Sequence, residues 1–167
     1  MVALACGTDR RFVPSLLESP TPDGRPRYSI DTVRALQRKR RRSDRLFFLI
    51  GVDAFLDLPH WKEYRRLLES VNFIVVSRPG FDAKQISAVV PLDLLRRGQG
   101  RKPRETIRLR HTSVQILHGV DVPVASRDIR DMVRGHRRVT GLVPPLVEQY
   151  ILKEALYRSR LRGVRRG

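Results

Sequence analysis

Two short runs dominated by apolar residues stand out along the chain, LFFLI at 46–50 and NFIVV at 72–76. Continuous rather than alternating apolar positions are typical of strands buried on both faces, as in a parallel sheet with helices on each side. The longest apolar run, residues 46–52, is seven residues long, which is too short to span a membrane. The pattern therefore predicts central strands of a parallel sheet.

Elsewhere the apolar residues recur at helical spacing or in weaker runs. We expect a helix over 29–41 with Ser29 as its N-cap, and a second helix over 61–70 that begins at Trp61. The remaining predicted elements are a strand at 12–18 weakened by Pro14, a strand at 113–117, helices at 126–133 and 144–157, a helix in the later part of 81–95, the end of a helix at 1–6, and loops at 19–27 and 98–105. This alternation predicts one α/β domain with a doubly wound parallel sheet.

The first strand-to-helix unit of such a fold is missing from the pattern. A βαβ unit needs about 30 residues or more, yet only eleven precede residue 12. Neither a Gly-x-Gly-x-x-Gly turn nor a Walker-type loop occurs anywhere in the chain. We therefore expect a doubly wound sheet that lacks its first βαβ unit.

The charge of the chain makes nucleic acid a partner to consider. Thirty-four Lys and Arg residues stand against seventeen Asp and Glu, which gives a net charge of +17. Only five of the basic residues are lysine, however, and the arginines are dispersed. We favour an arginine-rich compositional bias of a GC-rich genome over a nucleic-acid-binding face. Replacing the run RKRRR at 38–42 would test the alternative, because such binding depends steeply on salt.

The single cysteine and the N-terminus bear on the compartment. Cys6 excludes an internal disulfide, and the N-terminus lacks a basic region followed by an apolar stretch. Both observations fit a cytoplasmic protein.

Candidate binding residues follow the two central strands. In α/β sheets, ligands bind outside the carboxyl ends of the strands, where Gly51, Asp53 and Arg78 lie. A glycine at a strand end allows a ligand to approach the backbone, and Asp53 could accept hydrogen bonds from a ribose. The alternative is that Asp53 caps the short helix that follows. Trp61 could likewise stack on a flat ring or simply pack against the core.

A second candidate is the segment VASRDIR at 124–130. Ser126 and Arg130 are one helical turn apart, and free N–H groups at a helix start suit a phosphate. The alternative is an ordinary N-cap serine with a solvated arginine. The four histidines have no metal-ligand spacing, so the sequence predicts no protein-bound metal.

Five segments, taken in order, resemble bacterial nicotinate-nucleotide adenylyltransferases. They are RYSIDTVRAL at 27–36, FLIGVDAFLDLPHW at 48–61, FIVVSRPG at 73–80, VASRDIR at 124–130 and LVPPLVEQYILKEALY at 142–157. The resemblance covers essentially the whole chain. It implies a Rossmann-like sheet of the nucleotidyltransferase type.

The resemblance also implies a reaction and a set of roles. The 5′-phosphate of nicotinate mononucleotide attacks the α-phosphorus of ATP, with Mg²⁺, to give deamido-NAD and pyrophosphate. By this analogy Trp61 stacks on the pyridine ring, and backbone groups near Ser29 and Lys62 bind its carboxylate. Gly51, Asp53 and Arg78 belong to the nucleotide site. Ser126 and Arg130 bind the ATP phosphates, and Arg127 supplies an additional positive charge.

The chain departs from the family pattern in two places. Ala125 and Arg127 stand where the family usually has serine and threonine. The family's Gly-x-Phe-x-Pro-x-His-x-Gly-His motif is absent, so no catalytic residue is identified. It belongs to the missing first unit, and we expect either a start codon assigned too late or a truncated chain. As written, the chain should be nearly inactive and poorly soluble, with a disordered basic tail at 158–167.

Several alternatives stay open at this point. A nucleic-acid-binding module and a catalytically dead remnant that binds pyridine nucleotides compete with the enzyme. The sequence does not separate nicotinate from nicotinamide mononucleotide, and it leaves the oligomeric state open.

Overall fold

The computed structural model describes residues 1–7, 9–77, 83–98, 105–119 and 124–157. The chain forms two compact units, one of residues 17–121 and one that combines residues 1–16 with 122–167. Each unit is described by itself below.

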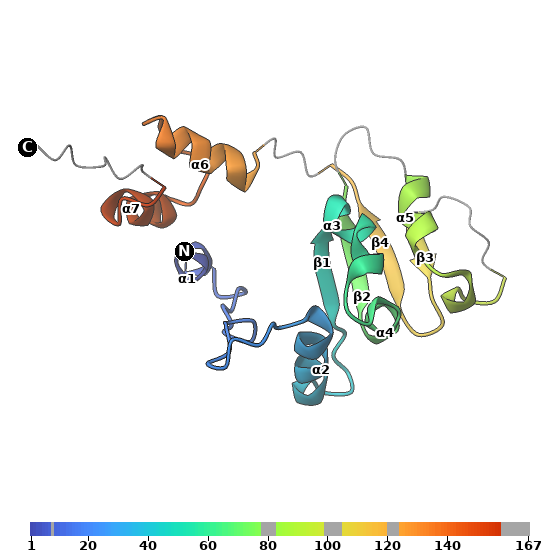
Figure 1. The fold of residues 1–167 in the computed structure, drawn as a ribbon. Helices are drawn as coiled ribbons and strands as arrows, with labels where there is room; N and C mark the ends of the chain where they lie inside the picture. The colour runs from blue at the N-terminus through green and yellow to red at the C-terminus, as the bar shows by residue number, and fades with distance from the viewer. Residues whose placement is uncertain (8, 78–82, 99–104, 120–123, 158–167) are drawn as a thin grey trace, which may run out of the picture. The chain divides into compact units, whose positions relative to one another are not determined.

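The larger unit contains a sheet of four described strands in the order β1-β2-β4-β3 (Figure 1). The strands are β1 (Phe47–Gly51), β2 (Asn72–Val76), β3 (Thr106–Arg108) and β4 (Ser113–Leu117). β2 pairs in parallel with both β1 and β4, whereas β3 runs antiparallel to β4. The predicted α/β class and its parallel sheet are confirmed.

Four α-helices and two short 3₁₀ helices accompany this sheet. They are α2 (Ser29–Lys39), α3 (Val52–Leu56), η1 (Leu58–His60), α4 (Tyr64–Ser70), α5 (Ala83–Val89) and η2 (Leu92–Leu94). α3 packs against β1, β2 and α5, while α4 packs against β2 and α2. The crossover from β1 to the parallel β2 therefore runs through α3 and α4, as a parallel pairing requires.

The register of the strands divides the side chains of the sheet between two faces. Phe73 and Val75 of β2 are fully buried and share a face with Val114 of β4 and Ile107 of β3. On the opposite face Phe47 is 37% exposed and Leu49 is 65% exposed. The core of this unit therefore lies between one face of the sheet and its helices.

A side-chain clamp holds the amino ends of three strands together. Asn72 Oδ1 accepts hydrogen bonds from the N–H and the hydroxyl of Ser113, each at 3.1 Å. The Asn72 amide donates to the carbonyl of Leu46 at 3.1 Å. Asn72 is the polar first residue of an otherwise apolar strand, and its side chain links β2 to Leu46, just before β1, and to the start of β4.

The smaller unit contains three described helices, α1 (Val2–Cys6), α6 (Ser126–Arg134) and α7 (Pro145–Lys153). α1 packs against α7, and the buried core of this unit consists of Ile129, Val133, Val139, Val147 and Ile151. Pro144 and Pro145 stand at the start of α7, where a missing N–H costs nothing.

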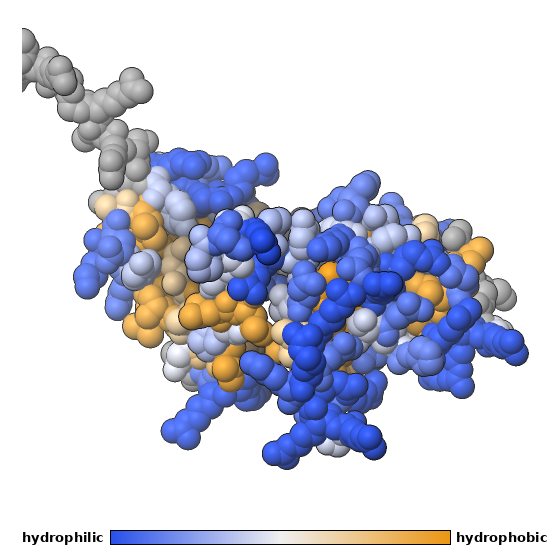
Figure 2. All heavy atoms as spheres, turned by 60° about the horizontal axis from the view of Figure 1, so that its bottom comes forward, coloured by the Kyte–Doolittle hydropathy of each residue, from blue (hydrophilic) through white to orange (hydrophobic). Residues whose placement is uncertain are grey.

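Hydrophilic side chains cover much of the face drawn in Figure 2, with apolar side chains reaching the surface between them.

Most predicted elements appear close to their expected bounds. β2 and β4 match them, and α2, α6 and α7 lie within the predicted helical regions, apart from one further residue at the end of α6. Residues 2–6 are helical, and residues 19–27 contain no helix or strand. The predicted tail at 158–167 lies outside the described residues, as do residues 99–104 of the predicted basic loop. No helix in the described part of the chain is long and apolar enough to cross a membrane.

Two strand predictions are wrong. Residues 12–18 form no strand; Phe12 is 61% exposed and Val13 is 83% exposed. Pro14 lacks an N–H to donate, and the segment pairs with none of the described strands. Burial of β1 on both faces is also wrong, because Leu49 stays exposed.

Four further details differ from the prediction. Ser29 is not the N-cap of α2, because Tyr28 occupies that position. Trp61 does not begin a helix, because Glu63 adopts a left-handed backbone with φ of 52° and α4 starts only at Tyr64. The helix within 81–95 lies in its earlier part, and Pro91 follows its end. Strand β3 was not expected; it is three residues long and carries a single buried side chain, Ile107.

The core predicts which truncations destabilise the larger unit. Phe55 is fully buried, and its ring centroid lies 5.5 Å from that of Phe73. Phe55→Ala should lower the free energy of unfolding by about 3–5 kcal/mol, because the cavity adds to the lost transfer energy. Urea denaturation followed by circular dichroism measures this. The control Leu49→Ala should stay within about 0.5 kcal/mol of wild type, and equal losses would contradict this division of the two faces.

Candidate functional site

A pocket of about 280 Å³ in the larger unit unites three of the predicted binding residues, Ser29, Trp61 and Lys62. One wall comes from the start of α2, and the other from the turn between η1 and α4. The pocket is completed by Arg27, Tyr28 and His60. Segments 30 residues apart in the sequence thus meet around one cavity.

Trp61 both packs against the core and lines this pocket. Its ring meets Phe48 edge to face, with centroids 6.2 Å apart and planes at 64°. The N–H of Trp61 donates to the carbonyl of Leu58 at 2.9 Å, which closes the 3₁₀ turn containing Pro59. The packing and lining interpretations of Trp61 are therefore compatible, since the indole is only partly buried.

A lysine and an arginine side chain line the pocket. Lys62 Nζ lies 4.1 Å from the centroid of the Tyr28 ring, within the range of a cation–π interaction. His60 Nδ1 lies 2.9 Å from a carboxylate oxygen of Asp57. With Arg27 also in the lining, the pocket suits a flat ligand that carries negative charge.

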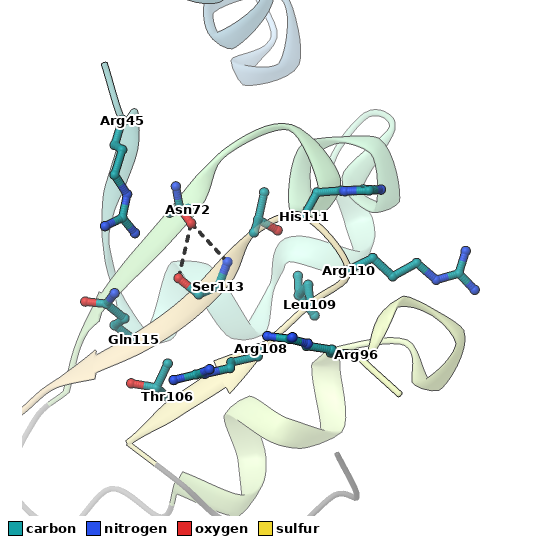
Figure 3. A pocket seen from close by; sticks show the side chains of 11 residues that line it. Arg45, Asn72, Arg96, Thr106, Arg108, Leu109, Arg110, His111, Ser113 and Gln115 are labelled. Carbon is teal, nitrogen blue, oxygen red and sulfur yellow. Dashed lines mark hydrogen bonds between the residues drawn. The ribbon is translucent and has the colours of Figure 1, made fainter. Parts of the chain in front are cut away.

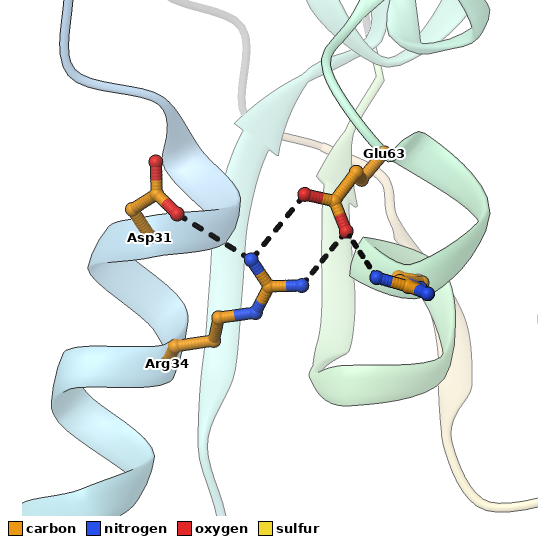
Figure 4. Close-up of polar contacts among 4 residues, drawn as sticks. Asp31, Arg34 and Glu63 are labelled. Atoms are coloured by element: carbon orange, nitrogen blue, oxygen red, sulfur yellow. Dashed lines mark hydrogen bonds and ion pairs between the residues drawn. The ribbon is translucent and has the colours of Figure 1, made fainter.

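An ion-pair network fastens the two walls of the pocket together (Figure 4). The Arg34 guanidinium of α2 donates to both carboxylate oxygens of Glu63, at 2.7 and 3.3 Å, and also contacts Asp31 at 3.4 Å. Arg66 donates to the same carboxylate at 2.8 Å. Because Glu63 directly follows Lys62, this bidentate pair fixes the Trp61–Lys62 turn relative to the start of α2.

The network also accounts for the strained backbone at Glu63. A left-handed conformation is uncommon for a residue with a long side chain, and it persists only where surrounding contacts enforce it. The hydrogen bonds from Arg34, followed by those from Arg66, lower the pKa of Glu63 from its ordinary value of 4.5. Reciprocally, Glu63 raises the pKa of Arg34.

Gly51 and Asp53 lie at the carboxyl end of β1. A Cβ atom placed on Gly51 would meet nothing within 4 Å, so the space beside this strand end is open. Asp53 is not the capping residue of α3, because Gly51 occupies that position. Instead it is exposed in the first turn of α3, where the positive end of the helix dipole stabilises a carboxylate. Arg78 lies outside the described residues.

Ser126, Arg127 and Arg130 belong to the smaller unit and are all exposed in the first turns of α6. Ser126 is not the N-cap as the sequence suggested; Ala125 is. The N–H of Ala125 donates to Asp128 Oδ2 at 2.9 Å, so a carboxylate already meets one of the free N–H groups of the helix start. The three residues therefore form one group within the first turns of α6.

Sequence reasoning missed several polar residues near these sites. Tyr28 and Arg27 could have been found, because they precede Ser29 within the same motif. Ser77 and His118 directly follow β2 and β4, with Ser77 Oγ 3.0 Å from His118 Nδ1. The strand-end rule that selected Gly51 would have found them. The Arg34–Glu63 pair gave no signal, because the two residues are 29 positions apart.

Comparisons with known proteins agree with this geometry. Residues 19–144 match a family model described as cytidylyltransferase-like. The chain is 38% identical to the "Probable nicotinate-nucleotide adenylyltransferase" of Geobacter sulfurreducens and 36% identical to that of Pelobacter propionicus. Each alignment covers 94% of this chain and 72% of the relative.

Two solved structures of Plasmodium falciparum nicotinic acid mononucleotide adenylyltransferase share the fold. The complex with APC aligns with a TM-score of 0.59 at 18% identity, and the complex with NaAD with a TM-score of 0.56 at 16% identity. The alignments cover 87% and 83% of this chain, but 64% and 60% of those structures.

The fold and the family model define a Rossmann-like α/β domain of the nucleotidyltransferase type. The identity to curated relatives then narrows the class. The chain belongs to the nicotinate-nucleotide adenylyltransferase family, as its motifs indicated.

The Glu63 network predicts an acid-dependent contribution to stability. Because the folded pKa of Glu63 lies below its ordinary value of 4.5, the contribution is present above that pH and is lost as the pH falls through the lowered pKa. Glu63→Gln should therefore lower Tm at neutral pH, by a difference that shrinks below about pH 4.5. Scanning calorimetry across this range measures it. The control Glu69→Gln removes a carboxylate of α4 outside this network and should lower Tm at neutral pH by less than Glu63→Gln does, and a Glu63→Gln deficit that persists in acid would contradict the ion-pair explanation.

Proposed function

We propose that this protein transfers the adenylyl group of ATP to nicotinate mononucleotide, a step in NAD biosynthesis. An oxygen of the 5′-phosphate of the mononucleotide bonds to the α-phosphorus of ATP. The bond from that phosphorus to the β-phosphate oxygen breaks, and pyrophosphate leaves with its electron pair. The observation that carries the proposal is the joining of Ser29, Trp61 and Lys62 around one pocket in a member of this family.

The pocket of the larger unit is the proposed acceptor site. Trp61 offers an aromatic face for the pyridine ring, and its contact with Phe48 limits how far the indole can turn. Lys62 and the first N–H groups of α2 near Ser29 would face the ring carboxylate, since both favour negative charge. Asp53 would accept hydrogen bonds from the ribose and Gly51 would let the nucleotide approach the strand end, with Arg78 as a further predicted ligand.

The proposed ATP-phosphate group is Ser126, Arg127 and Arg130 on α6. The hydroxyl and the two guanidiniums are exposed and supply donors of the kind that phosphates accept. Asp128 opposes them, because its carboxylate meets the N–H of Ala125 at the same helix start. Arg127 would offset this charge where the family usually has a threonine.

Transfers of this type depend on positioning and charge neutralisation rather than on covalent participation by the protein. No group of three or more His, Cys, Asp or Glu side chains gathers in the part of the chain that the structure describes. Mg²⁺ is therefore proposed to enter with ATP, bound to its phosphates, rather than in a site made of protein side chains alone. ATP and nicotinate mononucleotide are the proposed substrates and the cytoplasm the proposed compartment.

Intrinsic fluorescence tests the acceptor site directly, because Trp61 is the only tryptophan. Titration with nicotinate mononucleotide should change its emission in a saturable way, since the pyridine ring would lie against the indole. By calorimetry Trp61→Ala should weaken binding about tenfold, the scale of a lost base–aromatic stack. Nicotinamide mononucleotide serves as the comparison ligand. Saturation without any change in emission would exclude the stacking role of Trp61.

Gly51 offers a second test that separates binding from folding. A methyl group at this position meets no neighbouring atom within 4 Å, so Gly51→Ala should leave Tm unchanged. It would nevertheless narrow the space in which the mononucleotide approaches the strand end, and affinity measured by calorimetry should fall several-fold. Gly7→Ala in the smaller unit is the control and should change neither quantity. Unchanged affinity in Gly51→Ala would remove Gly51 from the site.

A further inference from the structure

A second hollow, of about 320 Å³, lies at the opposite end of the same sheet (Figure 3). Arg45 precedes β1, Asn72 and Ser113 begin β2 and β4, and Arg108 ends the antiparallel β3. The amino ends of the parallel strands thus border this hollow, whereas Gly51 lies at their carboxyl ends. Four arginines line it, and its described lining contains neither Asp nor Glu.

The backbone places two of these arginines opposite one another. Leu95 and Leu109 form an antiparallel bridge, and the N–H of Arg96 donates to the carbonyl of Arg108 at 3.1 Å. Arg96 and Arg108 are therefore a directly opposed cross-strand pair. An anion bound between them could accept hydrogen bonds from both guanidiniums.

Uncharged donors complete the floor of the hollow. Thr106 and Gln115 are opposed across β3 and β4, on the same face as Arg108 and Ser113, and both are half-buried. The Asn72–Ser113 hydrogen bonds hold this part of the sheet in place. Phe47 positions Arg45, whose guanidinium lies 5.2 Å from the centroid of the phenyl ring. In Figure 3 the side chain of Arg110 points away from the other arginines.

The neighbouring hollow shows that arginine content alone does not produce such a site. It has a volume of about 390 Å³ and shares Arg45 and Asn72 with the first, but Asp44 and Glu69 line it as well. The positive charge of its arginines is therefore partly balanced by carboxylates. Of these two hollows, the one around Arg96 combines opposed guanidiniums with neutral donors and has no carboxylate in its described lining.

We propose that the hollow lined by Arg45, Arg96 and Arg108 binds a di- or triphosphate group. Planar guanidiniums match the geometry of phosphate oxygens and keep their charge at any physiological pH. The volume suits a group of this size, since it stands at the lower end of ligand pockets. This site is independent of the proposed adenylyl transfer, because no residue lines both it and the pocket around Trp61.

Calorimetric titration of the full chain with tripolyphosphate tests the proposal. Arg96→Gln and Arg45→Gln should each weaken binding at this site about tenfold, as expected for lost hydrogen bonds between charged groups, whereas neither should change any binding at the proposed ATP-phosphate group on α6. Arg38→Gln on the exposed end of α2 removes the same charge outside the hollow and should have no effect. Arg45 precedes β1 and is exposed, so its variant remains informative if Arg96→Gln fails to fold. Saturating nicotinate mononucleotide should leave the affinity unchanged.

Pyrophosphate and ADP distinguish the source of the phosphates. Similar affinity for both would show that the phosphate group alone is recognised, and preference for ADP would assign the site to a nucleotide. The proposal fails if tripolyphosphate does not bind, or if Arg38→Gln weakens binding as much as Arg96→Gln does. It also fails if only a single-stranded oligonucleotide binds, because that result would indicate a general basic surface.

Discussion

The larger unit depends on the burial of Phe73 at the centre of its sheet. Its ring stacks on Phe48 of β1 with centroids 5.4 Å apart, and it meets Phe55 of α3 edge to face. Phe48 in turn contacts Trp61. A continuous series of aromatic contacts therefore leads from the fully buried core to the wall of the candidate pocket. Because close-packed interiors transmit changes in volume, the position of the Trp61 indole depends on the packing of Phe73, which it contacts through Phe48.

A strand could be predicted where its run of apolar residues corresponds to side chains that the fold buries. β2 is paired on both sides and presents fully buried Phe73 and Val75, so its apolar run was a reliable signal. β1 has an equally apolar run, yet Leu49 is exposed. An apolar run reports the environment a strand is suited to, whereas the observed exposure also depends on which elements cover each face. The strand prediction for residues 12–18 was wrong for a related reason, because a strand forms only where another strand accepts its hydrogen bonds.

The candidate site likewise has a part that the sequence predicts and a part that it does not. Ser29, Trp61 and Lys62 could be brought together from motifs, because local segments carry them. The restraint that fixes their geometry could not, since Arg34 and Glu63 lie far apart in the sequence and one of them adopts a left-handed backbone. Packing and stacking are not exclusive for Trp61, because a partly buried indole can present one edge to the core and one face to a ligand.

The two ends of the sheet illustrate how one composition produces different surfaces. At the carboxyl ends a glycine leaves open space, and a carboxylate follows it in the next helix. At the amino ends the register opposes Arg96 and Arg108 above a floor of uncharged donors. An arginine-rich composition explains why arginines are numerous, but it does not explain why Arg96 and Arg108 lie opposite each other, which follows from the backbone pairing. Composition sets the charge of this chain, and strand register determines where that charge is concentrated enough to hold an anion.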